Sequence, residues 1–377
     1  MNYKRKIITL VGTRPDIIKM SCIISELNFF FENVIVNTNQ NFNFELNKVF
    51  FKEMKIKNPK YSLNVLNKSP IQNISEMLVK FEKICNLEKP DGMVVLGDTN
   101  STLLSYVAKR KKIPIFHLEA GNRCHDQRVP EEINRKIVDH ISDINLTYSH
   151  ISRENLIYEG FPRDQVFNIG SPIKEVYSNY KKNIDKSKIL AKLSLKNNFF
   201  YLVSFHREEN LEDKKKITQF FNLLEYLEKK FDLPIIVSTH FRLKKKVLNN
   251  LKIKKNDFKK VKFLKPFGYF DYCKLQESAK IVFSDSGTIT EESSIMKFKA
   301  VNLRDTNERQ EGMEEGAVPM TGLNLNNIDT AIKILSKSNK QTNAIKSYEV
   351  DNVSGKVARI VISYIDYINQ KIWKKVI

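Results

Sequence analysis

The chain has 377 residues, 41% of them hydrophobic, so it is long enough for two domains of roughly 150 to 200 residues that each bury a core. No segment approaches about 18 apolar residues and the N-terminal apolar run is too short for a signal peptide, which argues against a membrane or exported protein. The net charge of +20 lies in lysine runs scattered over expected helix faces, without a nucleic-acid-binding motif, so we expect no nucleic-acid partner.

The four cysteines, Cys22, Cys85, Cys124 and Cys273, lie far apart and show no CxxC spacing. Closely spaced pairs are what a disulfide framework or a zinc site would show, so we expect neither. Free thiols suit a reducing compartment, and we predict a cytoplasmic protein that binds no metal.

The first predicted elements are a strand, a tight turn and a helix. Residues 7–11 are apolar, Gly12 permits the turn, and apolar residues recur at helical spacing from residue 17. Arg14 and Lys19 therefore lie near a helix N-terminus, where backbone N–H groups favour an anion. Because GTRP is neither a GxGxxG nor a P-loop signature, the pattern leaves open an exposed Arg and Lys on an ordinary βα unit.

The central stretch carries acidic residues after its predicted strands. Residues 93–96 and 113–116 are apolar runs. A carboxylate stands at the turn after each run, Asp98 in GDTNS and Glu119 in EAG, and Glu131 follows in VPEE. Each alone could merely cap or begin a helix. Three in succession favour convergence at one end of a sheet, because parallel strands deliver their carboxyl ends to a common crevice.

The remainder of the first half predicts a helix and two more strands. Arg135 follows Glu131 by four residues on the expected helix, which allows an ion pair between them. Residues 144–148 and 166–169 are strand-like, and the GSP sequence at 170–172 marks a domain boundary.

Predicted strands and helices also alternate in the second half, and we predict an α/β fold with domains at 1–172 and 173–356. The final stretch, 357–377, is apolar at helical spacing and is expected to pack back on the N-terminal domain. The candidate strands of the second half are 199–204, 234–238, 261–263, 281–284 and 300–303.

The sequence SDSGTITEE has the chemistry of an anion site. Ser286 offers a hydroxyl, Gly287 lets the backbone approach a ligand, and Glu291 and Glu292 fall in the first turns of the next helix. Such a helix N-terminus could hold a diphosphate while a carboxylate accepts from ribose hydroxyls. The alternative is a helix that is merely capped.

Two of the six histidines follow predicted strands. His206 begins HREEN and His240 ends another apolar run, so both could face the site. A lone histidine at a strand end is as readily a satisfied polar residue as a catalyst.

Seven motifs are spread along the chain: GTRPDIIK, GDTNST, HLEAGNR, RVPEEINR, HREEN, SDSGTITEE and RDTNERQEG. Taken together, they resemble those of the non-hydrolysing UDP-N-acetylglucosamine 2-epimerase family, in the family's order and spacing and over nearly the whole chain. The variants GNRCHDQRVPEE and SDSGTITEESS resemble the subgroup that makes UDP-N-acetyl-L-fucosamine for capsules and O-antigens.

The resemblance implies two Rossmann-like domains around a cleft, the GT-B-like architecture, a UDP-sugar substrate and a homodimer. It implies that Ser286 and Gly287 contact the diphosphate, Glu292 the ribose, and Arg309 the nucleotide. His240 is a further candidate for substrate binding. Thr288 and Thr290 replace the Gly and Gln of the commoner SGGxQEE pattern, which affects the expected loop geometry.

The family's route explains the need for several carboxylates. The C2 hydrogen of a 2-acetamido sugar nucleotide is not next to a carbonyl, so it becomes removable only as UDP leaves C1. UDP then returns to the 2-acetamidoglycal while a proton enters the opposite face of C2, which needs separately placed acid/base groups. The candidates are Asp98, Glu119 and Glu131, with Arg14, Lys19, Arg135 and His206 stabilising the departing diphosphate.

The specific hypothesis is conversion of UDP-2-acetamido-2,6-dideoxy-L-talose to UDP-N-acetyl-L-fucosamine. The alternatives are a UDP-N-acetylglucosamine 2-epimerase and a GT-B glycosyltransferase, which would need an acceptor. The route implies no nicotinamide and no metal cofactor.

Overall fold

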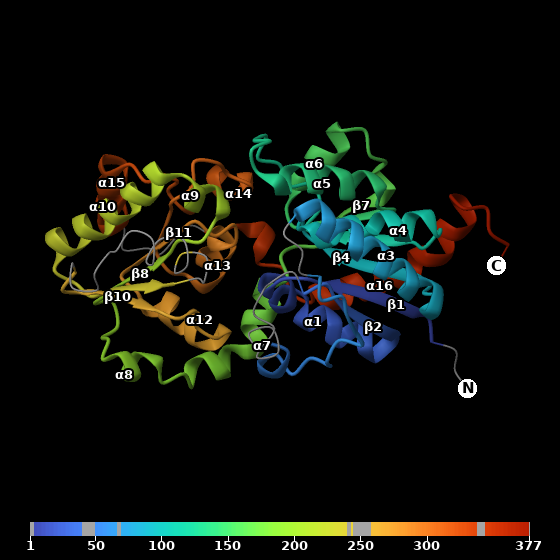
Figure 1. Cartoon of the computed structure of the whole chain (residues 1–377), viewed down its shortest axis with the longest axis horizontal. Helices are drawn as coiled ribbons and strands as arrows, with labels where there is room; N and C mark the ends of the chain where they lie inside the picture. The colour runs from blue at the N-terminus through green and yellow to red at the C-terminus, as the bar shows by residue number, and fades with distance from the viewer. Residues whose placement is uncertain are drawn as a thin grey trace. The chain divides into compact units, whose positions relative to one another are not determined.

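The computed structural model describes residues 4–39, 50–65, 69–239, 243, 258–337 and 344–376 (Figure 1). Two compact units make up the chain: the N-terminal unit comprises Met1–Val176 with Lys346–Ile377, and the C-terminal unit comprises Tyr177–Ile345. Each unit has its own parallel β-sheet with helices packed around it. The predicted α/β class with two Rossmann-like domains is therefore confirmed.

The described strands of the N-terminal unit form a parallel sheet in the order β3-β2-β1-β4-β5-β6-β7. Most of their side chains are buried, as expected for a parallel sheet that helices cover on both faces. The chain adds β2 and β3 on one side of β1 and then β4 to β7 on the other side, so a topological switch point lies between β1 and β4. Open α/β sheets bind ligands at such points. The strands are β1 (Lys6–Val11), β2 (Glu32–Asn37), β3 (Tyr61–Ser62), β4 (Gly92–Leu96), β5 (Ile115–Leu118), β6 (Ile144–Thr147) and β7 (Val166–Asn168).

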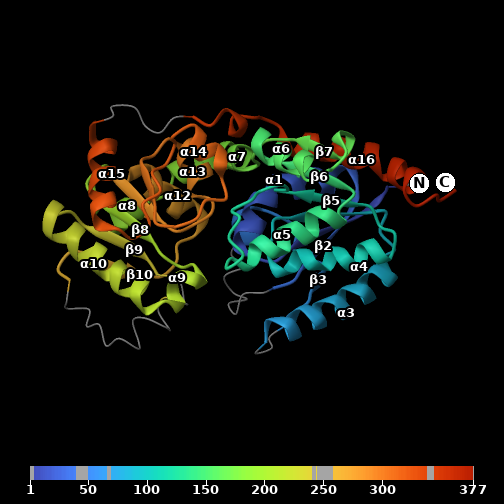
Figure 2. The same ribbon diagram turned by 90° about the horizontal axis from the view of Figure 1, so that it is seen from above.

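Helices α3, α4 and α5 lie on one side of this sheet and α1 and α16 on the other (Figure 2). Helix α16 packs against α1, so the end of the chain belongs to the N-terminal unit. The helices are α1 (Arg14–Phe30), α3 (Pro70–Glu88), α4 (Ser105–Arg110), α5 (Pro130–Ile141), α6 (His150–Tyr158), α7 (Ile173–Asp185), which continues into the C-terminal unit, and α16 (Val353–Lys371), with 3₁₀ turns η1 (Asn100–Leu104), η2 (Arg163–Gln165) and η5 (Lys346–Tyr348).

The C-terminal unit holds a parallel sheet in the order β10-β9-β8-β11-β12. Its core includes Phe205 and Phe220, whose stacked rings have centroids 4.4 Å apart. The strands are β8 (Tyr201–Ser204), β9 (Ile235–Ser238), β10 (Val261–Leu264), β11 (Ile281–Ser284) and β12 (Ala300–Asn302). The helices are α8 (Ile189–Leu193), α9 (Glu208–Glu212), α10 (Lys214–Phe231), α12 (Tyr269–Ser278), α13 (Ile289–Met296), α14 (Gln310–Glu314) and α15 (Leu325–Lys337).

Helix α10 shows how the basic residues are arranged. It buries an apolar stripe that includes Ile217 and Leu224, while Lys229 and Lys230 are exposed. The lysine run at 244–246 lies outside the described residues. Within the described part of the chain, no helix has both the length and the apolar character that a bilayer crossing requires.

Candidate functional site

The turns after β4 and β5 place two predicted carboxylates at one edge of the N-terminal sheet. Leu96 pairs with Leu118 across the two strands, and Gly97 N donates to Leu118 O at 3.0 Å. Asp98 follows Gly97, and Glu119 follows Leu118. They therefore leave neighbouring strands at the carboxyl end of the sheet, beside the switch point between β1 and β4.

Glu119 forms an ion pair with Lys19 of α1. Lys19 Nζ lies 2.5 Å from Glu119 Oε2, and the two side chains are 5% and 10% exposed. The same ammonium group lies 5.8 Å from the centre of the Tyr148 ring. Glu119 has a φ of 65°, a left-handed conformation that costs a non-glycine residue about 1 kcal/mol or more. The structure thus brings together two residues that the sequence places 100 positions apart.

Asp98 is held by the guanidinium group of Arg135 from α5. Asp98 Oδ2 accepts from Arg135 Nε at 3.0 Å and from Nη2 at 2.6 Å. Arg135 Nη1 also donates to Glu132 Oε2 at 3.0 Å. Arg135 is only 2% exposed whereas the Asp98 carboxylate is 21% exposed, so the arginine orients a carboxylate that solvent or a ligand can still reach. Glu131 is half-buried on the same turn of α5.

Glu132 is a buried residue whose role the sequence analysis missed. Its carboxylate accepts from the backbone N–H groups of Cys124 and His125, both at 3.1 Å, as well as from Arg135. It therefore fixes the loop between β5 and α5 and the arginine that holds Asp98. The spacing of three residues to Arg135 was a signal that it could pair with that arginine.

The first βα turn packs against the GDTNS loop. A Cβ atom on Gly12 would lie 2.1 Å from Ser101 Oγ, so only glycine allows this approach. Asp16 Oδ2 accepts from the N–H groups of Gly12 and Thr13 at 3.0 and 2.9 Å, and burial raises the pKa of Asp16 to about 6. Arg14 begins α1 with its guanidinium carbon 4.6 Å from the centre of the Phe50 ring.

A buried aspartate organises the corresponding edge of the C-terminal sheet. Asp285 follows β11, and its carboxylate accepts from the N–H groups of His206 and Arg207, which follow the neighbouring strand β8, at 3.0 and 2.9 Å. Asn210 Nδ2 donates to the same carboxylate at 3.1 Å. His206 Nδ1 lies 3.1 Å from Asp285 Oδ1, and the imidazole remains 35% exposed.

The contacts of Asp285 also set its charge. Burial raises the pKa of Asp285, but His206, the Arg207 amide and Asn210 outweigh that effect and lower the pKa to about 2. The aspartate is therefore ionised at neutral pH, and it holds His206 in one orientation at the edge of the sheet.

The turn at Ser286 and Gly287 leads into α13 and is tied to Glu292. Thr288 Oγ1 donates to Glu292 Oε1 at 2.7 Å and lies 2.9 Å from Ser286 Oγ. Gln276 Nε2 donates to the other carboxylate oxygen of Glu292 at 2.6 Å. Thr288, which departs from the commoner motif, therefore fixes the carboxylate that the resemblance assigns to the ribose.

Arginine side chains surround this turn. A Cβ atom on Gly287 would lie 2.8 Å from Arg207 Nη2 and 3.7 Å from Arg304 Nη1, so the absence of a side chain leaves the guanidinium groups close to the backbone. Arg304 pairs with Glu308 at 2.8 Å, and Arg309 pairs with the fully buried Glu291 at 2.8 Å. Arg207 and Asp285 were not among the predicted site residues, although Arg207 stands next to His206 and Asp285 next to Ser286.

The structure thus forms two groups of predicted residues, one in each unit. The N-terminal group joins Lys19 to Glu119 and Asp98 to Arg135. The C-terminal group places His206 beside the turn at Ser286 and Gly287 through Asp285. His240 lies outside the described residues.

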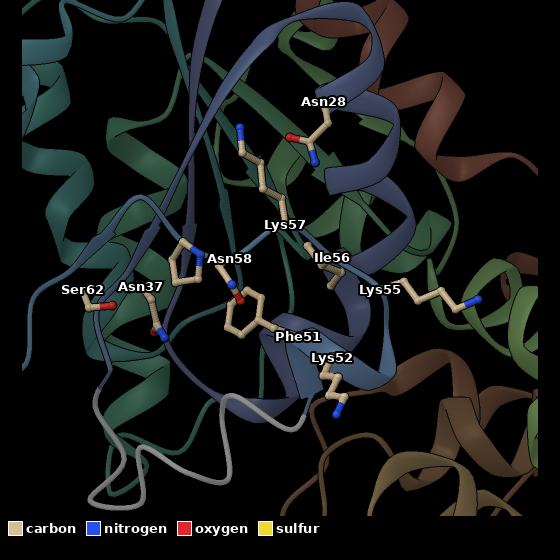
Figure 3. A pocket seen from close by; sticks show the side chains of 10 residues that line it. Asn28, Asn37, Phe51, Lys52, Lys55, Ile56, Lys57, Asn58 and Ser62 are labelled. Atoms are coloured by element: carbon tan, nitrogen blue, oxygen red, sulfur yellow. The ribbon is translucent and has the colours of Figure 1, made fainter.

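A pocket of about 940 Å³ lies elsewhere in the N-terminal unit (Figure 3). None of the predicted site residues lines it. Its lining consists of Asn28, Asn37, Phe51, Lys52, Lys55, Ile56, Lys57, Asn58, Pro59 and Ser62.

Comparison with known proteins matches a family profile described as UDP-N-acetylglucosamine 2-epimerase to residues 26–365. The structure of UDP-N-acetylglucosamine 2-epimerase from Rickettsia bellii is 44% identical, with a TM-score of 0.92, and the match covers 99% of this chain and 100% of that one. The Methanocaldococcus jannaschii UDP-GlcNAc 2-epimerase, solved in complex with UDP-GlcNAc and UDP, is 33% identical with a TM-score of 0.87, covering 95% and 99% of the two chains. UDP-2,3-diacetamido-2,3-dideoxy-D-glucuronate 2-epimerase from Pseudomonas aeruginosa is 30% identical over 84% of this chain and 88% of its own length.

Replacement of Asp285 by asparagine tests the buried anchor of the C-terminal group. Because the pKa of Asp285 is lowered, its stabilising effect is present above the pKa of an unfolded aspartate and is lost as the pH falls through about 2. We expect Asp285→Asn to lower the free energy of unfolding by about 2 kcal/mol at neutral pH. Urea denaturation should show that this difference narrows as the pH falls below about 4.

The matched control is Asp213→Asn, because Asp213 caps α10 on the surface and asparagine caps a helix equally well. Equal effects of the two substitutions, or a difference independent of pH, would contradict the role of Asp285.

Proposed function

Because the chain belongs to the UDP-N-acetylglucosamine 2-epimerase family, we propose that it inverts C2 of a UDP-2-acetamido sugar by elimination and re-addition of UDP. A UDP-sugar 2-epimerase is an isomerase, and the relatives solved with UDP-GlcNAc support a UDP-sugar as substrate. The observation that carries the proposed mechanism is the pair of carboxylates, Asp98 and Glu119, on neighbouring strand ends, each beside a buried cation.

The chemistry balances without an external reductant or oxidant. In the elimination, the C1–O bond breaks with its electron pair leaving on UDP, a base takes the proton from C2, and a C1=C2 double bond forms. In the return step, UDP adds to C1 while an acid supplies a proton to the opposite face of C2. Two proton-transfer groups at fixed, separate positions are therefore required.

We assign these proton transfers to the carboxylates Asp98, Glu119 and Glu131, without choosing the face on which each acts. Asp98 suits the task because Arg135 fixes its carboxylate yet leaves it accessible. Glu119 suits it because Lys19 stabilises the ionised form that a base requires.

The diphosphate of the substrate is anionic, so cations and hydrogen-bond donors are needed to bind it. We propose that Ser286 and Gly287 contact the diphosphate, with His206 and the unpredicted Arg207 beside them. Positively charged groups stabilise negative charge as it develops on the departing UDP, and Arg14, Lys19 and Arg135 serve this role in the N-terminal unit. Glu292 is proposed to bind the ribose and Arg309 the nucleotide.

For the sugar, the favoured candidate is UDP-2-acetamido-2,6-dideoxy-L-talose, with UDP-N-acetyl-L-fucosamine as product. The motif variants GNRCHDQRVPEE and SDSGTITEESS support it. The second candidate is UDP-N-acetylglucosamine, which the names of several relatives support. The Pseudomonas aeruginosa relative indicates that the family accommodates more than one UDP-sugar.

Proton NMR of each UDP-sugar with the enzyme in deuterated water tests the reaction and the substrate together. An elimination and re-addition should place deuterium at C2 of the epimerised product, because the proton returned to C2 comes from a group that exchanges with solvent. Turnover of the L-talo sugar supports the first candidate, and turnover of UDP-N-acetylglucosamine alone supports the second. UDP binding without exchange in either sugar would contradict the epimerase function and favour glycosyl transfer to an acceptor.

Substitution of the two carboxylates tests their assignment. Asp98→Asn and Glu119→Gln keep side-chain size but remove the proton-transfer group, so we expect each to lower kcat by about 10² to 10⁴-fold. Titration calorimetry with UDP should show that the nucleotide still binds.

The control for this pair is Glu154→Gln, which changes an exposed carboxylate on α6 of the same unit and should leave kcat unchanged. Full activity in both Asp98→Asn and Glu119→Gln would remove these residues from the mechanism.

We further propose that the protein is a homodimer that pairs through α3, α4 and α5, which lie side by side in the N-terminal unit (Figure 2). Tyr106 of α4 and Ile133 and Ile137 of α5 are 57%, 51% and 43% exposed. Grouped exposed apolar side chains are typical of a protein interface, and a two-fold dimer would bury the same patch on both copies.

Sedimentation measurements on the double variant Ile133→Glu with Ile137→Glu test this surface. Charges buried at the dimer interface should shift the sedimenting mass from dimer to monomer. Ile334→Glu, at an isoleucine that is 59% exposed on α15 of the C-terminal unit, is the control and should remain dimeric. A monomeric wild type, or a double variant that sediments like the wild type, would exclude this interface.

A further inference from the structure

His117 occupies the middle of the N-terminal sheet, in β5 between β4 and β6, and is fully buried. Its Nε2 lies 2.8 Å from the carbonyl oxygen of Gly97, the residue before Asp98. Its Nδ1 lies 2.9 Å from Asp139 Oδ1 on α5. One imidazole therefore joins the turn that carries Asp98 to a buried carboxylate of a separate helix.

Asp139 extends this connection to the turn that carries Glu119. Both of its carboxylate oxygens lie 3.3 Å from the N–H group of Gly121, two residues after Glu119. Oδ2 also accepts from Arg123 Nη1 at 2.7 Å, and the same guanidinium group pairs with Glu159, which follows the last residue of α6. A continuous line of contacts thus runs from Gly97 through His117 and Asp139 to Gly121.

The partners of His117 fix how this cluster is held. The Gly97 carbonyl can only accept, so His117 Nε2 is the donor in that contact. Burial raises the pKa of Asp139, but contacts with His117 and Arg123 outweigh it and lower that pKa, so the carboxylate is ionised. The buried Asp139 carboxylate is thus held by Arg123 and lies against the His117 imidazole.

We propose that His117 is a positioning residue that, through Gly97 O and the Asp139 contact with Gly121, sets the separation between the Asp98 and Glu119 carboxylates. The proposal rests on the proposed function, because a fixed separation matters only if both groups act on C2. His117 contacts Gly97 O and Asp139, so it acts on the two carboxylates through the backbone of their turns.

The physical reason is the geometry of proton transfer to two faces of one carbon. Asp98 and Glu119 emerge at one sheet edge, and proton transfer to C2 needs donor and acceptor within hydrogen-bond reach. A misplacement of about 1 Å at such a site can lower the rate by about 10²-fold. The side chains are held by Arg135 and Lys19, whereas the backbone of their turns is held by the His117 cluster.

The direct test compares His117→Gln with Thr9→Val. A glutamine amide can reach Gly97 O or Asp139 but cannot bridge them, so the two turns lose their connection. Thr9 is fully buried in β1 of the same sheet and its hydroxyl donates to Asn33 of β2 at 2.7 Å, so Thr9→Val removes a buried hydrogen bond that involves neither turn. Asp139→Asn, which keeps the shape and removes the charge, serves as a second variant.

We expect His117→Gln to lower kcat by about 10 to 100-fold with a KM for the UDP-sugar within about twofold of wild type, because misplacement affects the transition state more than binding. Asp139→Asn should likewise lower kcat with little change in KM. Thr9→Val should keep the wild-type kcat even if its Tm falls as much as that of His117→Gln. A kcat for His117→Gln equal to that of Thr9→Val, or a loss confined to KM, would overturn the positioning role. Deuterium exchange by the wild type separates this failure from failure of the proposed function, which would abolish exchange in the unmodified enzyme.

A measurement on the wild type covers the case in which both variants fail to fold. Nitrogen-15 NMR of histidine-labelled protein at neutral pH should show one imidazole whose Nε2 carries a proton that exchanges slowly with solvent, because that N–H is buried against Gly97 O. If no such histidine exists, the contact between His117 and Gly97 is absent in solution and the proposal is wrong.

Discussion

Buried carboxylates that accept from backbone amides hold the loops of both site groups, and the placement of the other functional side chains depends on them. The backbone N–H groups of a loop at a strand end have no carbonyl partner in the sheet. A carboxylate can accept charge-assisted hydrogen bonds from two of them. Such bonds and the neighbouring cations outweigh the cost of burial at Asp139 and Asp285, whose pKa values are lowered, but not at Asp16, whose pKa is raised to about 6. The four anchors are Asp16 for the first turn, Glu132 and Asp139 for the loop after β5, and Asp285 for the turns after β8 and β11.

The second feature is that the candidate acid/base groups are paired with cations before any substrate binds. Arg135 is shared between Asp98 and the buried Glu132, so it is oriented by a carboxylate that takes no part in the proposed chemistry. Lys19 reaches Glu119 from a different helix. Such preorganisation avoids rearrangement during the reaction, which is the main advantage of electrostatic stabilisation in a folded site.

The strands and the residues at their ends could be predicted well, because each strand of a parallel sheet appears in the sequence as an apolar run followed by turn residues. The strand predicted at 113–116 is found at Ile115–Leu118, because the turn that ends α4 extends to Ile113, whose N–H donates to Ala108 O. The anchors were harder to predict, since Asp285 binds residues almost 80 positions away and Asp139 lies inside a helix with no motif around it. Periodicity reports which face of a helix is buried but not which buried carboxylate has a distant partner.

The arrangement also explains why the reaction class is easier to infer than the sugar. Candidate UDP-sugars that differ at C4 to C6 present the same reacting atoms at C1 and C2, so groups such as Asp98 and Glu119 cannot distinguish them. Selection among sugars must then come from loops whose sequence differs while their anchors stay in place. The loop at His125 fits this description, since Glu132 holds its backbone N–H groups and leaves the exposed His125 side chain to vary without moving Arg135. A fold built in this way can change its substrate through loop residues while the carboxylates proposed to transfer protons remain fixed.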